Sequence, residues 1–254
     1  DRKPTSLPKY SSGKWYRVSA RNTQGQLAIF SSSTPFGQGE IVCSLDDLKA
    51  DERSIISWIS ISPNGRYLAL GICSDGSESN QIYIFDLTFS KVMESLPSQS
   101  LMDDWTGGVN WLPDSDGFYF LALVDGSSWF EKELIFHDIG TGKQTRPKIP
   151  LPQNMLKDYT LIMPSQSGRY LLAVHGMVTP RPVAILDLQL AGGVWVPFIS
   201  EVDGMFSGFG AEKGFIGVTD AGSPKGRLVY IAYDNPDPNN PDTWVELSPE
   251  TDAV

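Results

Sequence analysis

The residue types that catalysis requires are scarce in this chain, and their positions do not suit it. The two histidines, His137 and His175, both fall inside apolar runs of the kind that form β-strands. A serine peptidase needs a nucleophile, a base that activates it and donors for the oxyanion, but the G-x-S-x-G motif that carries such a serine does not occur. His137 precedes Asp138, yet neighbouring residues of a strand point to opposite faces of the sheet. We therefore expect no catalytic residue in this chain.

Metal and cofactor motifs are equally scarce. The DSDG run at 114–117 resembles the start of a calcium loop, but Phe118 takes the next ligand position and Tyr119 the required glycine position, so a hairpin turn is the better interpretation. The two cysteines, Cys43 and Cys73, cannot build a four-cysteine zinc site, and both end apolar runs. We expect them to be free, partly buried thiols, which fits a reducing compartment. We thus predict no metal, no cofactor and a cytoplasmic location, with a periplasmic one left open.

Composition and charge exclude several further classes of protein. Acidic residues outnumber basic ones by 30 to 20, which gives a formal net charge of −10. Nucleic-acid binders and proteins of anionic membranes carry basic patches instead. The longest apolar run, FYFLALV at 118–124, is too short to span a bilayer, and the first ten residues lack the apolar stretch of a signal peptide. With 41% hydrophobic residues, 24 glycines and 18 prolines, the chain suits many short strands joined by tight turns.

An internal repeat organises these strands. Four segments share a strand, a turn with glycine and a second strand: SWISISPNGRYLALGIC, GVNWLPDSDGFYFLALV, TLIMPSQSGRYLLAVHG and GMFSGFGAEKGFIGVTD. Their turn glycines, Gly65, Gly117, Gly168 and Gly214, are spaced by 52, 51 and 46 residues. A third strand then ends in Asp86, Asp138, Asp187 or Asp234, and a fourth strand follows each time. Upstream, the runs KWYRVSA, QLAIFS and EIVCSL predict three strands of a partial first unit.

Turn chemistry explains why these positions recur. In SPNGR, Pro63 presets the first corner and Gly65 supplies the left-handed φ that closes the hairpin. The strand-ending aspartates can accept hydrogen bonds from the amides of the next turn. The run SLDDLKADER at 44–53 is the one plausible helical turn, with a serine cap.

These patterns predict an all-β fold. Four-stranded units at this spacing, with strands apolar on both faces, are typical of a β-propeller of antiparallel blades. An immunoglobulin-type sandwich would need shorter strand spacing and a clear alternation of apolar and polar residues. We expect a single domain over 1–254 with an N-terminal extension at 1–9 and about five blades, at 10–47, 54–98, 105–150, 157–200 and 203–250.

The residues also resemble a known family. SISPNGRYLALGICSDGSESNQIYIFDL and GVNWLPDSDGFYFLAL are similar to successive blades of the N-terminal propeller of prolyl oligopeptidases, peptidase family S9. The closing RLVYIAYDNPDPNNPDTWVELSPE resembles the end of that family's fifth blade. The resemblance implies a seven-bladed propeller followed by an α/β-hydrolase domain that cleaves short peptides after proline. This chain carries about five of those blades and no hydrolase motif, so we expect it to be inactive alone.

The resemblance also implies site residues. Glu78, in GSES, aligns with an acidic residue that bridges to an arginine of the hydrolase domain. Trp105, in DDWTGGVNW, and Tyr159, in KDYTLIM, align where the family has residues that line substrate subsites; Thr106 is the other candidate in the first run. His175, in AVHGM, lies near a basic, substrate-facing position. Blade packing is the alternative for all four.

Two functions remain open on the sequence. The first is the lid and substrate filter of a prolyl-oligopeptidase-like serine peptidase, with the hydrolase domain of the same polypeptide and short peptides as partners. The second is a free-standing propeller that binds proteins or small ligands, as the periplasmic Tol-system propeller does. Tol-type repeats are shorter, and the Pro-Asn-rich ending here favours the first function.

Overall fold

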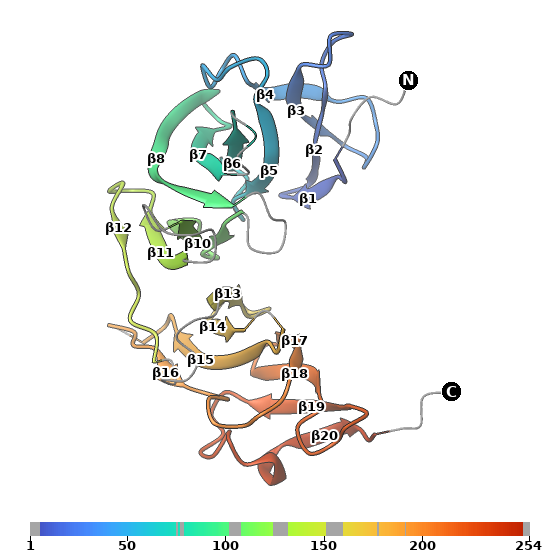
Figure 1. Cartoon of the computed structure of the whole chain (residues 1–254), viewed down its shortest axis with the longest axis vertical. Helices are drawn as coiled ribbons and strands as arrows, with labels where there is room; N and C mark the ends of the chain where they lie inside the picture. The colour runs from blue at the N-terminus through green and yellow to red at the C-terminus, as the bar shows by residue number, and fades with distance from the viewer. Residues whose placement is uncertain are drawn as a thin grey trace. The chain divides into compact units, whose positions relative to one another are not determined.

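The computed structural model describes residues 6–74, 76, 79–101, 108–123, 132–150, 160–176, 178–190 and 192–250. These residues form β-strands and one short 3-10 helix, η2 (Pro241–Thr243), and no α-helix occurs among them (Figure 1). The strands make five antiparallel four-stranded sheets, in which strands adjacent in sequence are adjacent in the sheet. The predicted all-β fold of four-stranded blades is confirmed.

The bounds of the strands follow the repeat. Sheet 1 contains β1 (Lys9–Ser11), β2 (Lys14–Ala20), β3 (Leu27–Ser32) and β4 (Glu40–Ser44). Sheet 2 contains β5 (Ile55–Ile61), β6 (Tyr67–Cys73), β7 (Ser79–Asp86) and β8 (Lys91–Leu101). Sheet 3 contains β9 (Asn110–Trp111), β10 (Gly117–Leu123), β11 (Lys132–Asp138) and β12 (Gln144–Thr145). Sheet 4 contains β13 (Thr160–Pro164), β14 (Tyr170–His175), β15 (Arg181–Asp187) and β16 (Val196–Pro197). Sheet 5 contains β17 (Phe206–Gly210), β18 (Gly214–Thr219), β19 (Arg227–Ala232) and β20 (Val245–Ser248).

The first sheet has one strand more than the sequence predicted. Residues Lys9–Ser11 form β1 and pair with β2, with Ser11 opposite Lys14, so the unit expected to be partial contains four strands. The side chain of Lys9 also donates to the carbonyl of Ile59, at 3.0 Å, in the next sheet. A three-residue polar strand shows no hydrophobic period, which is why pattern reading assigned Lys9 to an extension.

The prediction of a helical turn at 44–53 is wrong. Residues 45–49 form a turn without helix, and Lys49 has a left-handed φ of 54° that ends any helical path. The expected cap is also reversed, because the Asp47 carboxylate accepts from the Ser44 backbone N–H at 2.8 Å and from its hydroxyl at 2.7 Å.

The four repeated glycines serve two different purposes. Gly65 and Gly168 have φ of 72° and 70° and close their hairpins in the left-handed region, as predicted. Gly117 does not; in its turn the left-handed residue is Ser115, with φ 68°. A Cβ on Gly117 would lie 2.6 Å from the backbone oxygen of His137 on the neighbouring strand, so close approach of two strands requires this glycine.

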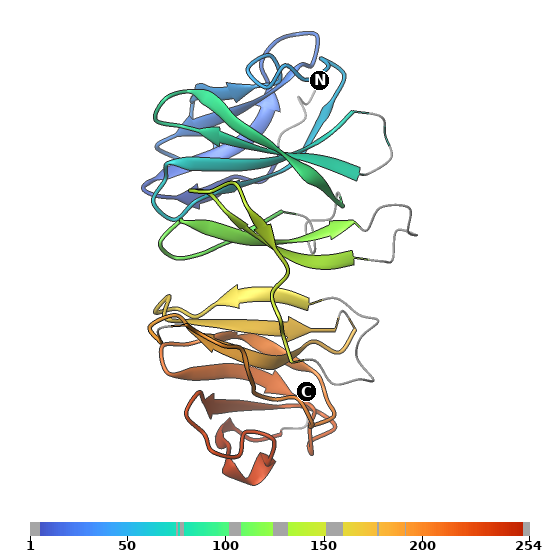
Figure 2. The ribbon, with the colours of Figure 1, turned by 90° about the vertical axis from the view of Figure 1, so that its left-hand side faces the viewer.

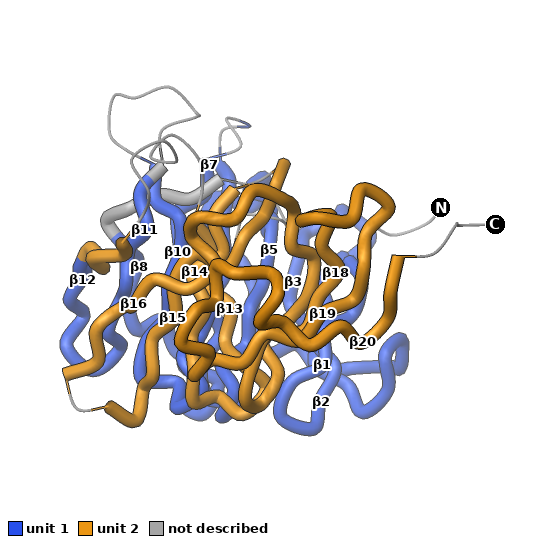
Figure 3. The backbone as a smooth tube through the Cα atoms, turned by 90° about the horizontal axis from the view of Figure 1, so that it is seen from below, with its two compact units in different colours: residues 1–145 blue, residues 146–254 orange. Residues whose placement is uncertain are grey.

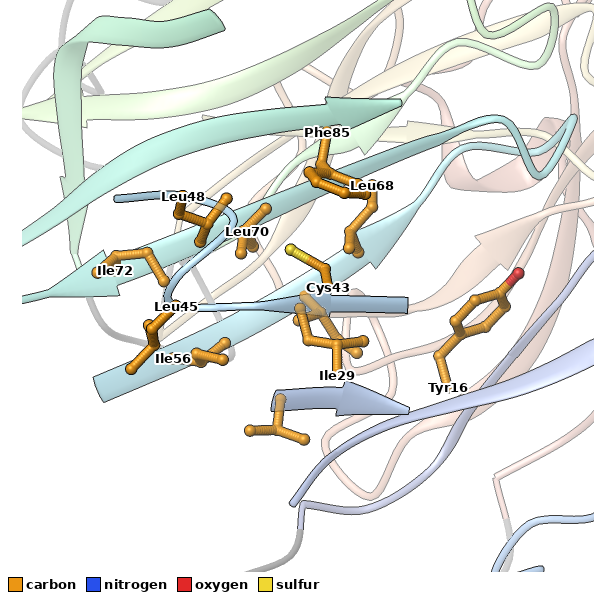
Figure 4. Packing of buried hydrophobic residues seen from close by; sticks show 12 residues of the cluster. Tyr16, Ile29, Cys43, Leu45, Leu48, Ile56, Leu68, Leu70, Ile72 and Phe85 are labelled. Atoms are coloured by element: carbon orange, nitrogen blue, oxygen red, sulfur yellow. The ribbon is translucent and has the colours of Figure 1, made fainter. Parts of the chain in front are cut away.

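The chain divides into two compact units, residues 1–145 with sheets 1–3 and residues 146–254 with sheets 4 and 5 (Figures 2 and 3). Within unit 1, one apolar cluster lies between sheets 1 and 2 (Figure 4) and a second between sheets 2 and 3. Within unit 2, one cluster joins sheets 4 and 5. Strands such as β6, buried at six of seven residues, are covered on both faces, as expected for blades.

Both cysteines are buried, and neither forms a disulfide bond. Cys43 belongs to the cluster between sheets 1 and 2. Burial, with a contribution from the Asp47 carboxylate, raises the pKa of the Cys43 thiol to about 12.

Candidate functional site

The connections to which the resemblance assigns functional residues lie at one end of the sheets in each unit. In an antiparallel sheet, the connection from second to third strand and the one from the fourth strand to the next sheet leave at the same end. In unit 2 these are the connections β14–β15, β16–β17 and β18–β19, and they touch one another. The Phe206 N–H donates to the Pro180 carbonyl at 2.7 Å, and the Met205 N–H donates to the Asp220 carboxylate at 2.7 Å. We call this the loop end of unit 2.

Three buried polar residues lie beneath the loop end of unit 2. Thr160 begins β13, His175 ends β14 and Arg181 begins β15, and the strand register places them side by side. Their exposed fractions are 6%, 1% and 8%. The Thr160 hydroxyl lies 2.8 Å from Nδ1 of His175, within hydrogen-bonding distance. A polar layer of this kind is held in place by its own hydrogen bonds rather than by solvent.

Arg181 links this layer to the β16–β17 connection above it. Its Nη1 donates to the carbonyl of Val202 and lies 3.9 Å from Oδ1 of Asp203, whose side chain is fully exposed. A buried guanidinium thus fixes the backbone of the connection from below.

Further hydrogen bonds hold the β16–β17 connection in place. The side-chain oxygen of Asn239 accepts from the N–H groups of Ser200 and Glu201, at 2.9 and 2.8 Å. Gly204 has a φ of 142°, and a Cβ there would lie 2.8 Å from the Asp220 carboxylate. The result is a fixed rim that exposes Met205 and carries carboxylates. Such a rim can bind or orient a partner.

Of the candidate site residues taken from the sequence, the structure describes only His175. Glu78, Trp105 and Tyr159, and with them Thr106, lie outside the described residues. His175 lies in the buried layer described above, so its ring contacts protein. Its substrate-facing role stays a prediction. Sequence reasoning missed Arg181, although a single arginine at the start of the apolar run RPVAILD was a usable signal.

The side chains of His137 and Asp138 contact different partners, as expected for adjacent residues of a strand. His137 is fully buried, and its Nε2 lies 2.8 Å from the Glu94 carboxylate of the neighbouring sheet. The Asp138 carboxylate instead accepts from the backbone N–H and the hydroxyl of Thr141, at 2.7 and 2.9 Å. Neither residue faces a nucleophile among these contacts.

The described part of the chain holds no group of three or more His, Cys, Asp or Glu side chains placed to bind a metal ion. At 114–117 the chain forms a turn in which the Asp114 carboxylate accepts from the Asp116 N–H at 3.0 Å. No helix within the described residues is long and apolar enough to cross a bilayer.

A family model matches nearly the whole chain. The model of the prolyl oligopeptidase N-terminal β-propeller domain matches residues 3–253. A search of curated protein sequences finds no significant match. Among solved structures, a prolyl endopeptidase studied for inter-domain dynamics in catalysis and specificity is similar, with 16% identity and a TM-score of 0.71.

Prolyl oligopeptidase B from Galerina marginata, bound to a 35mer hydrolysis and macrocyclization substrate, is similar with 17% identity and a TM-score of 0.69. Each of these two comparisons covers 98% of this chain and 37% of the other chain. The chain therefore spans little more than a third of the length of these similar structures.

Proposed function

The chain belongs to the prolyl oligopeptidase family, as a match to its N-terminal propeller domain, and from this premise we propose that it serves as the lid and substrate filter of a serine peptidase. In this proposal the hydrolysis of short proline-containing peptides takes place on an α/β-hydrolase domain of the same polypeptide. The propeller contributes no catalytic group and acts through its loop ends.

The observation that carries the proposal is the extent of the family match. The propeller-domain model matches residues 3–253, nearly the whole chain, and the five antiparallel sheets have the strand order that this fold requires. The two similar solved structures described above are a prolyl endopeptidase and a prolyl oligopeptidase, and the second is bound to a 35mer hydrolysis and macrocyclization substrate. These findings favour a propeller joined to a peptidase over a free-standing binding module.

The physical basis for filtering is steric and electrostatic. As a lid over the active site, the propeller would exclude folded polypeptides and admit flexible ones, because a folded chain would have to unfold before it could enter. We assign Glu78 to an ion pair with an arginine of the hydrolase domain, and Trp105 and Tyr159 to substrate contacts. We also assign His175 to a substrate contact, which requires its buried ring to become accessible. The fixed rim above Arg181 supports this arrangement, because it holds the loop end in one conformation.

Activity measurements on two forms of the protein test the proposal. The chain alone and the polypeptide extended through its hydrolase domain are each incubated with a Gly-Pro chromogenic peptide. We expect cleavage by the extended form, abolished by a serine-directed phosphonate, and none by the chain alone. Phosphonate-sensitive turnover by the chain alone would refute the proposal. Equal cleavage of a folded protein and of a short peptide by the extended form would refute the filter.

The interdomain assignment has its own test. Glu78→Gln removes the negative charge but keeps the shape of the side chain. In the extended form we expect this variant to lower kcat/KM and weaken domain closure. Unchanged kinetics would remove Glu78 from the assignment.

A further inference from the structure

A pocket of about 620 Å³ opens between sheets 1 and 2 of unit 1. One wall is residues 24–27, which end the β2–β3 connection and begin β3, and the other is residues 52–55, which end the β4–β5 connection and begin β5. By strand order, these connections lie at the same end of unit 1 as β6–β7 and β8–β9. The hairpin β1–β2 lies at the opposite end, where the Ser12 hydroxyl donates to the Pro63 carbonyl at 2.8 Å.

The pocket wall is fixed before any ligand arrives. The Asn22 side-chain oxygen accepts from the N–H groups of Gln24 and Gln26, at 3.1 and 3.2 Å. The side-chain oxygen of Gln26 accepts from Arg21 at 2.9 Å and from Asn22 at 2.7 Å. Its amide nitrogen donates to the Glu52 carboxylate, at 3.0 Å, across the pocket. This network orders the backbone of residues 22–26 and the Glu52 side chain, so the conformational entropy lost on binding would come mainly from the Gln24 and Arg53 side chains.

Several polar groups on the walls remain available to a ligand. In the described structure the Arg53 guanidinium and the Gln24 carboxamide form no hydrogen bond or ion pair, and both residues are exposed. Glu52 uses one oxygen for Gln26. One cation and one anion balance each other, so the pocket does not select a phosphate or a polyanion by charge. The pocket offers both hydrogen-bond donors and acceptors, and a peptide backbone, which carries an N–H donor and a C=O acceptor in each unit, can pair with both.

The walls also provide apolar contact and room. Ile55 is 44% exposed and Leu27 is half-buried, so the two offer apolar surface beside the polar groups. Gly25 has no side chain to cover the backbone, and the space beyond its Cα holds no heavy atom within 4 Å of a Cβ position. An extended chain can therefore approach the β2–β3 connection closely.

We propose that this pocket binds an extended, uncharged peptide segment. Gln24, Glu52 and Arg53 meet its backbone groups, and Leu27 and Ile55 contact an apolar side chain such as proline. The inference rests on the proposed function, in which peptides are the substrates, and adds a binding place for the part of a longer peptide that is remote from the cleaved bond. Such a second contact raises the effective concentration of the remaining peptide.

Direct binding to the chain tests the proposal without relying on catalysis. The probe is a fluorescein-labelled, uncharged, proline-containing dodecapeptide, titrated with the 254-residue chain and followed by anisotropy. We expect saturable binding that is at least tenfold weaker for the double variant Gln24→Ala/Arg53→Ala. Thr23→Ala, in the same exposed connection but outside the pocket wall, is the matched control and should bind like the parent chain.

The variants are chosen so that folding does not confuse the outcome. Gln24 and Arg53 are exposed and their side chains support no described contact, so the unfolding midpoint of the double variant should equal that of the parent. Absence of saturable binding, equal affinity of the double variant, or displacement of the peptide by inorganic phosphate would each overturn the proposal. Failure of the filter function would appear instead in the cleavage assay of the extended form.

Discussion

Arg66 and Asp86 join the second and third strands of sheet 2, with the Nε of Arg66 3.0 Å from Oδ2 of Asp86. Arg66 follows the turn glycine, and its guanidinium carbon lies 4.9 Å from the centre of the Tyr67 ring. Asp86 is 1% exposed and also accepts from the N–H groups of Thr88 and Phe89, at 2.8 and 3.1 Å. One carboxylate therefore fixes two turns of the sheet.

Sheet 4 repeats this arrangement. Arg169 and Asp187 are 2.6 Å apart between Nη2 and Oδ2, and the guanidinium carbon of Arg169 lies 4.8 Å from the centre of the Tyr170 ring. In sheets 3 and 5 phenylalanine follows the turn glycine instead. The Arg–Asp pair thus occurs in sheets 2 and 4 but not at the same position in sheets 3 and 5, and its contribution to stability can be measured.

The Arg66→Ala substitution should lower the free energy of unfolding by about 1 to 3 kcal/mol. It leaves the buried Asp86 carboxylate without its charged donor, and an unpaired buried acceptor is costly. Urea denaturation measures the change, and Arg53→Ala is the matched control because the Arg53 side chain has no described contact. Equal stability of the two variants would show that the pair contributes nothing.

Stability should fall in acid because of these carboxylates. Burial opposes the ionisation of Asp86, but hydrogen bonds from Phe89, Arg66 and Thr88 outweigh it and hold its pKa below the usual value. The Arg169 hydrogen bond likewise lowers the pKa of Asp187. Folded pKa values below the unfolded ones mean that the native state binds fewer protons, so the stabilisation is present above about pH 4 and is lost as pH falls through the folded values.

Urea denaturation at a series of pH values tests this pH dependence. The parent chain should lose stability steadily below about pH 4, and Asp86→Asn should show a shallower loss over the same range because one of the shifted groups is removed. A parent chain whose stability does not change on acidification, or an Asp86→Asn variant with an unchanged slope, would contradict the assignment.

The sequence predicted those parts of the fold that depend on local pattern. The repeat of apolar strands, the turns and the strand-ending aspartates follow from period and turn chemistry, and Asp86 accepts from the next turn as expected. Pattern reading could not find β1, which is three residues of mixed polarity. Pattern alone also predicts that Gly117 closes its turn with a left-handed φ, as Gly65 does. Its actual role, which is to allow close approach of the neighbouring strand, leaves no signal in the local sequence.

The candidate site was less predictable, because it depends on contacts distant in sequence. Asn239 fixes the N–H of Glu201 across 38 residues, and no spacing rule connects two such positions. His175 was chosen by resemblance, which does not reveal that its ring is buried against Thr160. The position of Arg181 at the start of an apolar run marks it as unusual, but the sequence does not show that its partner is the carbonyl of Val202, 21 residues away.

Gly117→Ala should destabilise the chain more than an ordinary surface substitution does. The added Cβ would lie 2.6 Å from the His137 backbone oxygen, so two strands must separate, and overpacking of this kind costs about 1 to 3 kcal/mol. Gly140→Ala is the control, because a Cβ there meets its nearest neighbour, the Asp138 carboxylate, at an ordinary 3.5 Å. Thermal unfolding compares the two, and equal midpoints would contradict the steric argument.

His137 and Glu94 should be energetically coupled, because they join sheets 2 and 3 through one buried contact. The His137 ring is fully buried, with Nε2 2.8 Å from the Glu94 carboxylate and no hydrogen-bond partner on Nδ1 in the described structure. Glu94→Ala therefore removes the one polar contact that the imidazole makes within the described residues, and we expect a loss of about 1 to 3 kcal/mol in the free energy of unfolding.

A double-mutant cycle isolates this coupling from other effects of either substitution. In a His137→Phe background, where an aromatic ring remains against Phe118 but no N–H is buried, Glu94→Ala should cost at least about 0.5 kcal/mol less than in the parent chain. The measurement is urea denaturation of the four chains. Additive effects would show that the His137–Glu94 contact does not stabilise the interface between sheets 2 and 3.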